Sequence, residues 1–224
     1  MRKITKIFSR NEHAAIGIGT MIIFIAMVLV AGIAASVLIQ TSSRLESQAM
    51  TTGQETTEEV SGGISIDDVT GHITTEMDML GITVRCRAGS PDIDLNHTII
   101  ELTDGTTQVL LSYDYAGSAA DSAEHFNATI DADANLFGTG NISLLTNEEF
   151  GIIVLNDPDS SISRFNPVIN RGDKVVLTVD ANACFSEIGE RTEVTGRVLP
   201  EIGSPGIISF TTPASYADTV YDLQ

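Results

Sequence analysis

The apolar and polar positions of the chain first mark out one long hydrophobic stretch. Residues 14–39 are apolar except for the glycines, Thr20 and Ser36, and no charged residue occurs between them and Arg44. This run exceeds the roughly 7 to 15 apolar residues of an ordinary secretory signal. Even about 24 of its residues would form a helix of about 36 Å, enough to cross a hydrocarbon core of about 30 Å. The pattern therefore predicts a membrane-grade helix.

Charge on either side of this stretch predicts its orientation. Four cations, Arg2, Lys3, Lys6 and Arg10, precede it together with a single acid, Glu12. Because basic residues stay on the cytoplasmic side of a membrane, the leader should remain in the cytoplasm and the bulk of the chain should lie outside. A single-pass membrane anchor is the simplest interpretation.

The helical pattern continues beyond the apolar stretch, but there its apolar residues lie on one side alone. Leu38, Leu45, Ala49 and Val60 keep a helical spacing, and charged or polar residues fill the positions between them. The apolar stretch is also rich in Gly, Ala and Ser, which let helix backbones approach closely. These two properties predict a helix that packs among copies of itself.

From Gly62-Gly63 onward, the pattern changes to short strand-like runs separated by turn residues. The clearest pair flanks Asp104-Gly105, which divides two β-rich runs as a two-residue hairpin would. Further strands are predicted to begin near Ile82, Gly151, Asp173, Thr192 and Gly206. Several short strands without intervening helices argue for a sandwich. The expected fold class is α+β, with a long hydrophobic N-terminal α-helix followed by an all-β, immunoglobulin-like sandwich.

Composition narrows the function. Of 224 residues, 12 are Lys or Arg and 30 are Asp or Glu, which gives a formal net charge of −18. So few cations cannot neutralise many phosphates, which argues against a nucleic-acid partner. No H-E-x-x-H, C-x-x-C, G-x-S-x-G or P-loop motif occurs, and the four His are scattered. We therefore expect a structural protein and no enzyme.

The segment GIGTMIIFIAMVLVAGIAASVLI, residues 17–39, resembles the N-terminal signature of archaeal flagellins (archaellins), the filament subunits of the archaellum. The segment GIISFTTPASY, residues 206–216, is similar to the closing strand of that family. Bacterial type IV pilins resemble this layout, but they carry Glu at the fifth mature position, which here is Gly19. The resemblance therefore favours an archaellin.

This resemblance implies a class III signal peptide, residues 1–14, cleaved between Ala14 and Ala15 by a prepilin-peptidase-like enzyme. A polymerisation helix, residues 15–60, and a β-sandwich outer domain, residues 61–224, would then form the mature subunit. Loss of the leader removes a charge of +3 and brings the net charge to −21. The residues that match the family signature of the polymerisation helix are Gly17, Ile18, Gly19, Thr20, Met21, Ile22, Ile23, Phe24, Ile25, Ala26, Met27, Val28, Leu29, Val30 and Ala31.

The function and location expected of the chain also follow from the resemblance. We expect a structural subunit of the archaellum that polymerises through its N-terminal helix into a helical propeller for swimming. Expected partners are further copies of the chain, related archaellins, the signal peptidase, and the archaellum motor and membrane-platform proteins, with transient membrane insertion of the precursor. The mature chain would be extracellular. The alternatives are an archaeal type IV adhesion pilin and a single-pass, membrane-anchored β-domain surface protein.

Candidate modification sites lie in the β region. Asn96, Asn127 and Asn141 each begin an N-glycosylation sequon, and export would expose them to a glycosyl transferase. Archaellins as a family are often N-glycosylated, so an N-linked glycan is expected, and no cofactor. Cys86 and Cys184 can form a disulfide in the oxidising exterior or remain as buried thiols, and both interpretations stay open.

A candidate cation site involves Asp131, Asp133 and Asn135, which place oxygen ligands at alternate positions as a calcium loop does. An EF-hand would also need Gly at the sixth position and Glu at the twelfth, and both are missing. Asp157 and Asp159 are similarly placed for a turn. We therefore expect solvated acidic turns, with a structural cation as the alternative.

Overall fold

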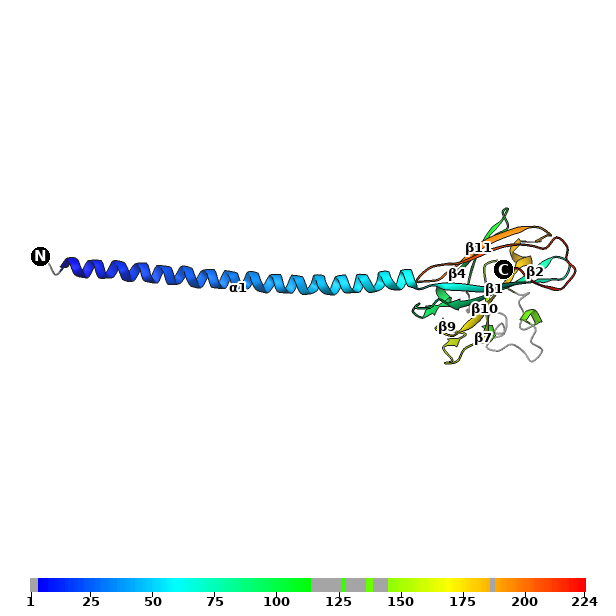
Figure 1. The fold of residues 1–224 in the computed structure, drawn as a ribbon, viewed down its shortest axis with the longest axis horizontal. Helices are drawn as coiled ribbons and strands as arrows, with labels where there is room; N and C mark the ends of the chain where they lie inside the picture. Colours follow the sequence, from blue (N-terminus) through cyan, green and yellow to red (C-terminus); the bar gives the residue numbers. More distant parts are fainter. Residues whose placement is uncertain (1–3, 114–125, 128–135, 139–144, 186–187) are drawn as a thin grey trace. The chain divides into compact units, whose positions relative to one another are not determined.

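The computed structural model describes residues 4–113, 126–127, 136–138, 145–185 and 188–224, with side chains from residue 16 onward (Figure 1). A single helix, α1 (Ile4–Ser61), comes first, and the remaining elements are almost all strands. The chain divides into two compact units, Met1–Gln54 and Glu55–Gln224. The expected order of a long N-terminal helix followed by a β-sandwich is confirmed.

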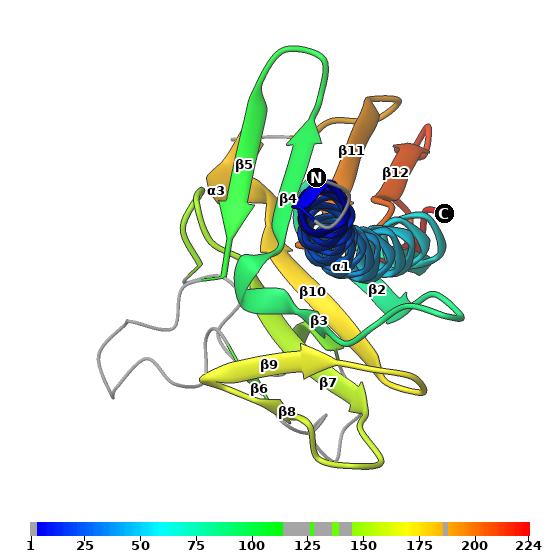
Figure 2. The same cartoon turned by 90° about the vertical axis from the view of Figure 1, so that its left-hand side faces the viewer.

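Among the residues that the structure describes, two main sheets form the β domain. The six-stranded sheet has the order β13-β1-β2-β10-β7-β6, and the four-stranded sheet has the order β12-β11-β4-β5. A smaller three-stranded sheet, β3-β9-β8, lies beside them (Figure 2). Their bounds are β1 (Ile64–Ile73), β2 (Met77–Cys86), β3 (Ile93–Asp94), β4 (Ile99–Thr103), β5 (Gln108–Ser112), β6 (Phe126–Asn127), β7 (Gly151–Asn156), β8 (Ile162–Ser163), β9 (Asn166–Ile169), β10 (Lys174–Asp180), β11 (Glu193–Leu199), β12 (Gly206–Thr211) and β13 (Val220–Asp222). Three short helices, η1 (Leu95–His97), η2 (Leu136–Gly138) and α3 (Ala181–Phe185), connect strands.

The core lies between the two main sheets, because their strands alternate buried and exposed side chains. In β4 and β5, for example, Ile100 pairs with Leu111 and Leu102 pairs with Val109, and all four side chains are buried. Alternate residues point to opposite faces of a strand. Burial of each such aliphatic side chain contributes about 1.5–3 kcal/mol. This spacing fixes which face of each sheet turns inward.

The central strand β10 departs from alternation, since all its residues after the first are buried. Leu177 faces the main core, whereas Val176 belongs to a second apolar cluster with Phe137, Leu145 and Ile153. The segment around η2 therefore covers the outer face of β10 and β7. A strand that is covered on both faces needs a continuous apolar sequence, as the run VVLTV provides.

The hairpin predicted at Asp104-Gly105 exists, but its turn is longer than the two residues expected. Strand β4 ends at Thr103 and β5 begins at its pairing partner, Gln108, so four residues form the connection. The Asp104 carboxylate accepts hydrogen bonds from the backbone N–H groups of Thr106 (2.7 Å) and Thr107 (2.6 Å). This local capping by the side chain stabilises the longer turn.

Two glycines, Gly62 and Gly63, follow the end of helix α1 and lie between two loops of the β domain. The carbonyl of Gly62 accepts a hydrogen bond from Ser204 N (2.9 Å), and the carbonyl of Gly63 accepts one from Arg87 N (2.9 Å). Gly63 has a φ of 132°, and a Cβ built there would lie 2.2 Å from the backbone oxygen of Ser204. Only glycine fits a position with both a left-handed conformation and a backbone in contact. The path from helix to sheet is therefore fixed.

This geometry predicts the effect of Gly63→Ala. The substitution should lower the stability of the β domain by about 2 kcal/mol or more, because it adds strain at a positive φ and a clash with Ser204. For a domain of this size, that is a fall of about 5 °C in the unfolding midpoint measured by calorimetry. Gly189→Ala is the control, since Gly189 has no heavy atom within 4 Å of a built Cβ. Equal unfolding midpoints for the two variants would contradict the predicted clash at Gly63.

Candidate functional site

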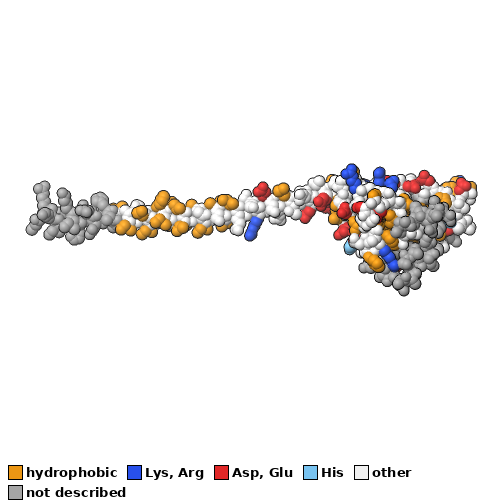
Figure 3. Space-filling model, turned by 90° about the horizontal axis from the view of Figure 1, so that it is seen from below, with side chains coloured by type: hydrophobic (Ala, Val, Ile, Leu, Met, Phe, Trp, Pro, Cys, Tyr) orange, Lys and Arg blue, Asp and Glu red, His pale blue; other side chains and the backbone are white. Residues whose placement is uncertain are grey.

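The main functional surface is the apolar part of α1, which no other part of the described chain covers. Fifteen large apolar side chains between Ile16 and Ile39 are each more than half exposed, from Val37 at 51% to Ile39 at 70%. The exposed residues lie on all sides of the helix, as Figure 3 shows in orange for one face. The segment is long and apolar enough to cross a membrane. In water, each such side chain left exposed forgoes about 1.5–3 kcal/mol, so this surface requires lipid or other chains around it.

Two threonine hydroxyls in and just after this stretch bond to the helix itself. The hydroxyl of Thr20 donates to the carbonyl of Gly17 (2.9 Å), and the hydroxyl of Thr41 donates to the carbonyl of Leu38 (3.0 Å). Such back-bonding removes the need for water at the hydroxyl. The segment can therefore lie in an environment that offers no hydrogen bonds.

The glycines of the helix have no explanation within the chain. A Cβ built at Gly17, Gly19 or Gly32 would meet no atom within 4 Å apart from the local helix. Glycine in a helix interior costs about 1 kcal/mol relative to alanine. A packing reason for these glycines must therefore come from outside the chain, and close approach of another helix is the usual one.

The predicted cleavage bond between Ala14 and Ala15 lies within α1. The side chains of residues 4–15 are outside the described part, so cleavage stays a prediction. The residues Gly17, Ile18, Gly19, Thr20, Met21, Ile22, Ile23, Phe24, Ile25, Ala26, Met27, Val28, Leu29, Val30 and Ala31, expected to drive polymerisation, all lie on the exposed apolar stretch, where Gly19 is the one half-buried residue.

The sequons differ in how the fold holds them. At the first, Asp94 caps η1 by accepting from Asn96 N (2.8 Å), while the Thr98 side chain is fully buried and its hydroxyl donates to the Asp94 carbonyl (3.2 Å). The threonine that a sequon requires is thus sequestered once this turn has folded. Asn127 lies in β6 and is half-buried. Asn141 lies outside the described residues.

Of the two interpretations left open for Cys86 and Cys184, the structure has free thiols and no disulfide, and the sheet register explains why. Strand β10 runs antiparallel to β2, so its last residue, Asp180, pairs with Met79. Cys86 ends β2 at the opposite end, and Cys184 follows Asp180 in α3. At about 3.3 Å per residue, the two ends are about 20 Å apart, far beyond the Cα separation of about 4.4–6.8 Å that a disulfide needs.

Both cysteines are free. The Cys86 thiol donates to the carbonyl of Ile169 (3.4 Å). Burial raises the pKa of each thiol to about 12, with the carboxylates of Asp173 near Cys86 and Asp180 near Cys184 adding to the effect. The thiols are therefore protonated at neutral pH and are poor nucleophiles.

Three carboxylates that the cation prediction did not combine meet at the base of the β9–β10 turn. The ligand atoms of Asp157, Asp159 and Asp173 lie within 4.8 Å of one another. Asn170 holds two of them, since its side chain donates to Asp159 (2.7 Å) and its backbone N–H donates to Asp173 (2.9 Å). The candidates Asp131, Asp133 and Asn135 lie outside the described residues. Thirteen residues lie between Asp159 and Asp173, so no local spacing reveals this cluster.

Electrostatics make this cluster suitable for a cation. Asp173 is 1% exposed and its Oδ1 atom has no partner in the described part of the chain. Burial raises the pKa of Asp173, because the ionised carboxylate loses its solvation. The hydrogen bond from Asn170 lowers the pKa of Asp159. Carboxylate oxygens at this spacing are the ligands that Ca²⁺ takes, and a bound cation would keep Asp173 ionised.

We expect millimolar Ca²⁺ to raise the unfolding midpoint of the chain by about 5 °C, since a ligand at 100 times its Kd adds about 2.7 kcal/mol. Asp173→Asn should abolish the shift, and chelation should reverse it. Asp218→Asn, a change at an exposed carboxylate outside the cluster, should retain it. An unfolding midpoint that neither Ca²⁺ nor a chelator changes would argue against a bound cation.

The exposed apolar helix and the β domain together define a class of protein: a structural subunit that assembles with other chains. The model of the archaeal-type flagellin family matches residues 14–210. Flagellin B2 of Methanocaldococcus jannaschii is 46% identical over 223 residues, 97% of each chain. Flagellin B3 of Methanococcus voltae is 36% identical and covers 98% of this chain and 99% of its own.

Solved structures agree with these relatives. The crystal structure of archaeal flagellin FlaB1 from M. jannaschii superposes with a TM-score of 0.63 at 34% identity, over 73% of this chain and 97% of that one. The archaeal flagellum of Methanospirillum hungatei has the same fold, with a TM-score of 0.60 over 92% of this chain and 98% of that one at 14% identity. The chain belongs to the archaeal-type flagellin family. It is a structural subunit of the archaellum filament, on the outside of the cell.

Proposed function

We propose that the chain polymerises through α1 after its leader is removed between Ala14 and Ala15, and that the assembled helices form the inside of the filament. The observation that carries the proposal is the uncharged stretch of residues 15–43, whose apolar side chains are exposed all round. Further support comes from Gly17, Gly19 and Gly32, which nothing in the chain itself requires.

Removal of the leader is the step that permits assembly. Before cleavage, the cations of residues 1–14 hold the precursor at the cytoplasmic face of the membrane. If they were retained, Arg2, Lys3, Lys6 and Arg10 would enter the apolar inside of a filament, at several kcal/mol for each charge left unpaired. After cleavage, the first residues of the chain are apolar and the subunit can leave the lipid for other helices.

The same proposal assigns the chemistry and the motor work to other proteins. A prepilin-peptidase-like enzyme would cut the leader, and archaellum motor and membrane-platform proteins would assemble and turn the filament, in which related archaellins can join. The chain itself would be non-catalytic. In support, its relatives are structural flagellins and its two thiols are protonated at neutral pH.

N-terminal sequencing of filaments sheared from cells tests the cleavage. The sequence should begin at Ala15 and continue Ile16, Gly17. The cell membrane fraction provides the control, since uncleaved precursor there should begin at Met1. Sheared filaments whose subunits retain Met1, or a sheared fraction that lacks the chain, would refute the proposal.

We also propose that at least one sequon carries an N-linked glycan. Because Thr98 is buried, we expect Asn96 to be modified only before its turn folds. Intact-mass measurement of native filaments should give a mass above that of the polypeptide, and Gln substitutions at the three Asn residues should remove the excess one site at a time. A native mass equal to the bare chain rules the glycan out.

A further inference from the structure

Positive charge is scarce in the β domain and is concentrated at one place. The unit Glu55–Gln224 holds seven of the 12 cations of the chain and 28 of its 30 acids. Four of the seven, Arg85, Arg87, Arg171 and Lys174, line a single open pocket of about 400 Å³. Like charges dispersed over a surface repel one another less than clustered ones, so this clustering calls for an explanation.

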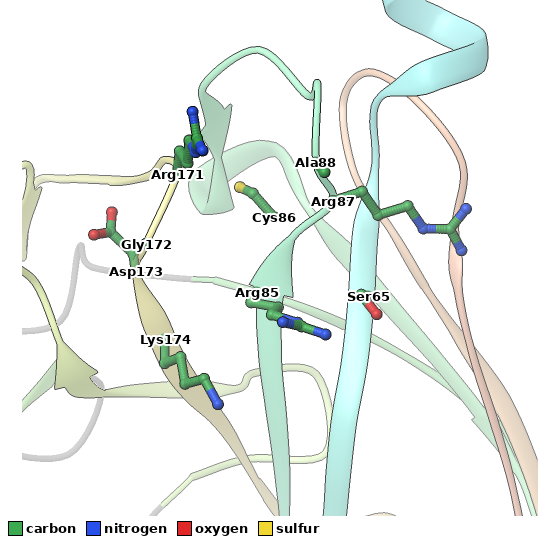
Figure 4. A pocket seen from close by; sticks show the side chains of 9 residues that line it. All are labelled: Ser65, Arg85, Cys86, Arg87, Ala88, Arg171, Gly172, Asp173 and Lys174. Carbon is green, nitrogen blue, oxygen red and sulfur yellow. The ribbon is translucent and has the colours of Figure 1, made fainter.

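Three separate segments bring the cations together (Figure 4). Arg85 lies near the end of β2, Arg87 lies in the loop that follows, and Arg171 and Lys174 come from the turn before β10 and from its first residue. Figure 4 shows Arg171 and Lys174 on one side of the pocket, Arg87 on the opposite side, and Arg85 on β2 between the two sides. The four side chains are exposed. They therefore surround the pocket, and their charged ends do not converge on one point.

The chain itself neutralises these four cations only in part. Asp67 is shared by two cations, with Oδ1 2.6 Å from Arg85 Nε and Oδ2 3.0 Å from Lys174 Nζ. Arg87 and Arg171 form no ion pair with any described residue. Asp67 lies outside the lining of the pocket, in which Asp173 supplies the one carboxylate among the described residues. Four positive charges thus meet two negative ones, in a domain where 28 acids outnumber seven cations fourfold.

The spread of the four cations around the pocket selects the kind of ligand. A single small anion is best bound by cations that converge on it, as Arg side chains do on a phosphate or carboxylate. Cations spread over separate segments instead match several negative charges carried along a chain. The filament supplies such a chain, because each copy presents a domain with 28 acids to its neighbours.

Repulsion between copies makes this match necessary. Each β domain carries a charge of −21, and neighbouring domains in a filament repel one another at any contact closer than the screening length of about 8 Å at physiological salt. Surfaces of like sign then associate only where a complementary patch exists. The pocket is the complementary patch that the described surface offers.

We propose that this pocket binds an Asp- or Glu-bearing segment of a second copy of the chain, and that this contact fixes the spacing of neighbouring β domains in the filament. The proposal rests on the filament function above, which supplies the second copy. It adds to the apolar contact of the helices a polar contact between outer domains, one that salt weakens.

Carbodiimide treatment of sheared native filaments tests the contact directly, because it joins an amine to a carboxylate without a spacer. Lys174 is the sole lysine after Lys6, so the mature chain offers one lysine amine, and it lies in the pocket. Denaturing gels should show a ladder of covalent oligomers, and mass spectrometry should find Lys174 joined to an Asp or Glu of another copy. Lys174→Arg keeps the charge but removes the amine, and should abolish the ladder.

A matched pair of charge reversals tests the energetics. Arg171→Glu in the pocket and Arg191→Glu in the turn before β11 both change the charge by −2 at an exposed residue. Filaments with Arg171→Glu should release at least about ten times more subunit at low salt than filaments with Arg191→Glu, since like charges in contact cost more than the 1.4 kcal/mol of a tenfold change. Both variants should retain the unfolding midpoint of the native chain.

Three results would overturn the assignment while leaving the filament function intact. The first is coupling of Lys174 to Asp67 of the same chain alone, with no ladder. The second is coupling to a sugar acid of a glycan instead of a side-chain carboxylate. The third is equal release from the two charge-reversal variants. Absence of the chain from the sheared fraction would overturn the filament function, and the assignment with it.

Discussion

The uncharged stretch of residues 15–43 imposes the constraint on which the rest of the molecule depends. Its apolar side chains are exposed all round, so the chain alone cannot satisfy it, and lipid or other copies must. No charged residue occurs between Glu12 and Arg44, so every charge from Arg44 onward lies on the distal helix or the β domain. The β domain, by contrast, buries its own apolar residues between two sheets. The β domain therefore buries its apolar side chains without a partner, whereas the apolar helix needs lipid or other chains to do so.

Much of the fold could be predicted from the sequence, because local patterns carried it. The helix, its end before Gly62-Gly63 and the runs that became β7, β10, β11 and β12 all followed from spacing and turn residues. Strand β1 was missed. Its register shifts between Ile66 and Asp68, and this bulge breaks the alternation that marks a strand. Strand β13 was missed because its three residues are exposed or half-buried, and its pairing with β1 joins residues far apart in the sequence.

Site prediction succeeded for the helix and failed where residues distant in sequence combine. The apolar signature is contiguous, so its sequence alone identified it. The two cysteines gave no sign of lying at opposite ends of one sheet, which depends on the register of β10 against β2. Likewise Asp173 joins Asp157 and Asp159 because β10 pairs with β7, and Arg171 lies across the pocket from Arg87 because β10 also pairs with β2. Such combinations are properties of topology, which spacing does not encode.

The backbone hydrogen bonds of Gly62 and Gly63 to two loops of the β domain also bear on how this domain carries mechanical load. Tension transmitted along the chain from α1 enters the domain at Ile64, the first residue of β1. Strand β1 lies between β2 and β13, both antiparallel to it. Ladder hydrogen bonds of antiparallel strands run perpendicular to the strands, so a pull along β1 loads them in shear and they must break together instead of one at a time. The last strand of the chain thus reinforces the strand through which force arrives.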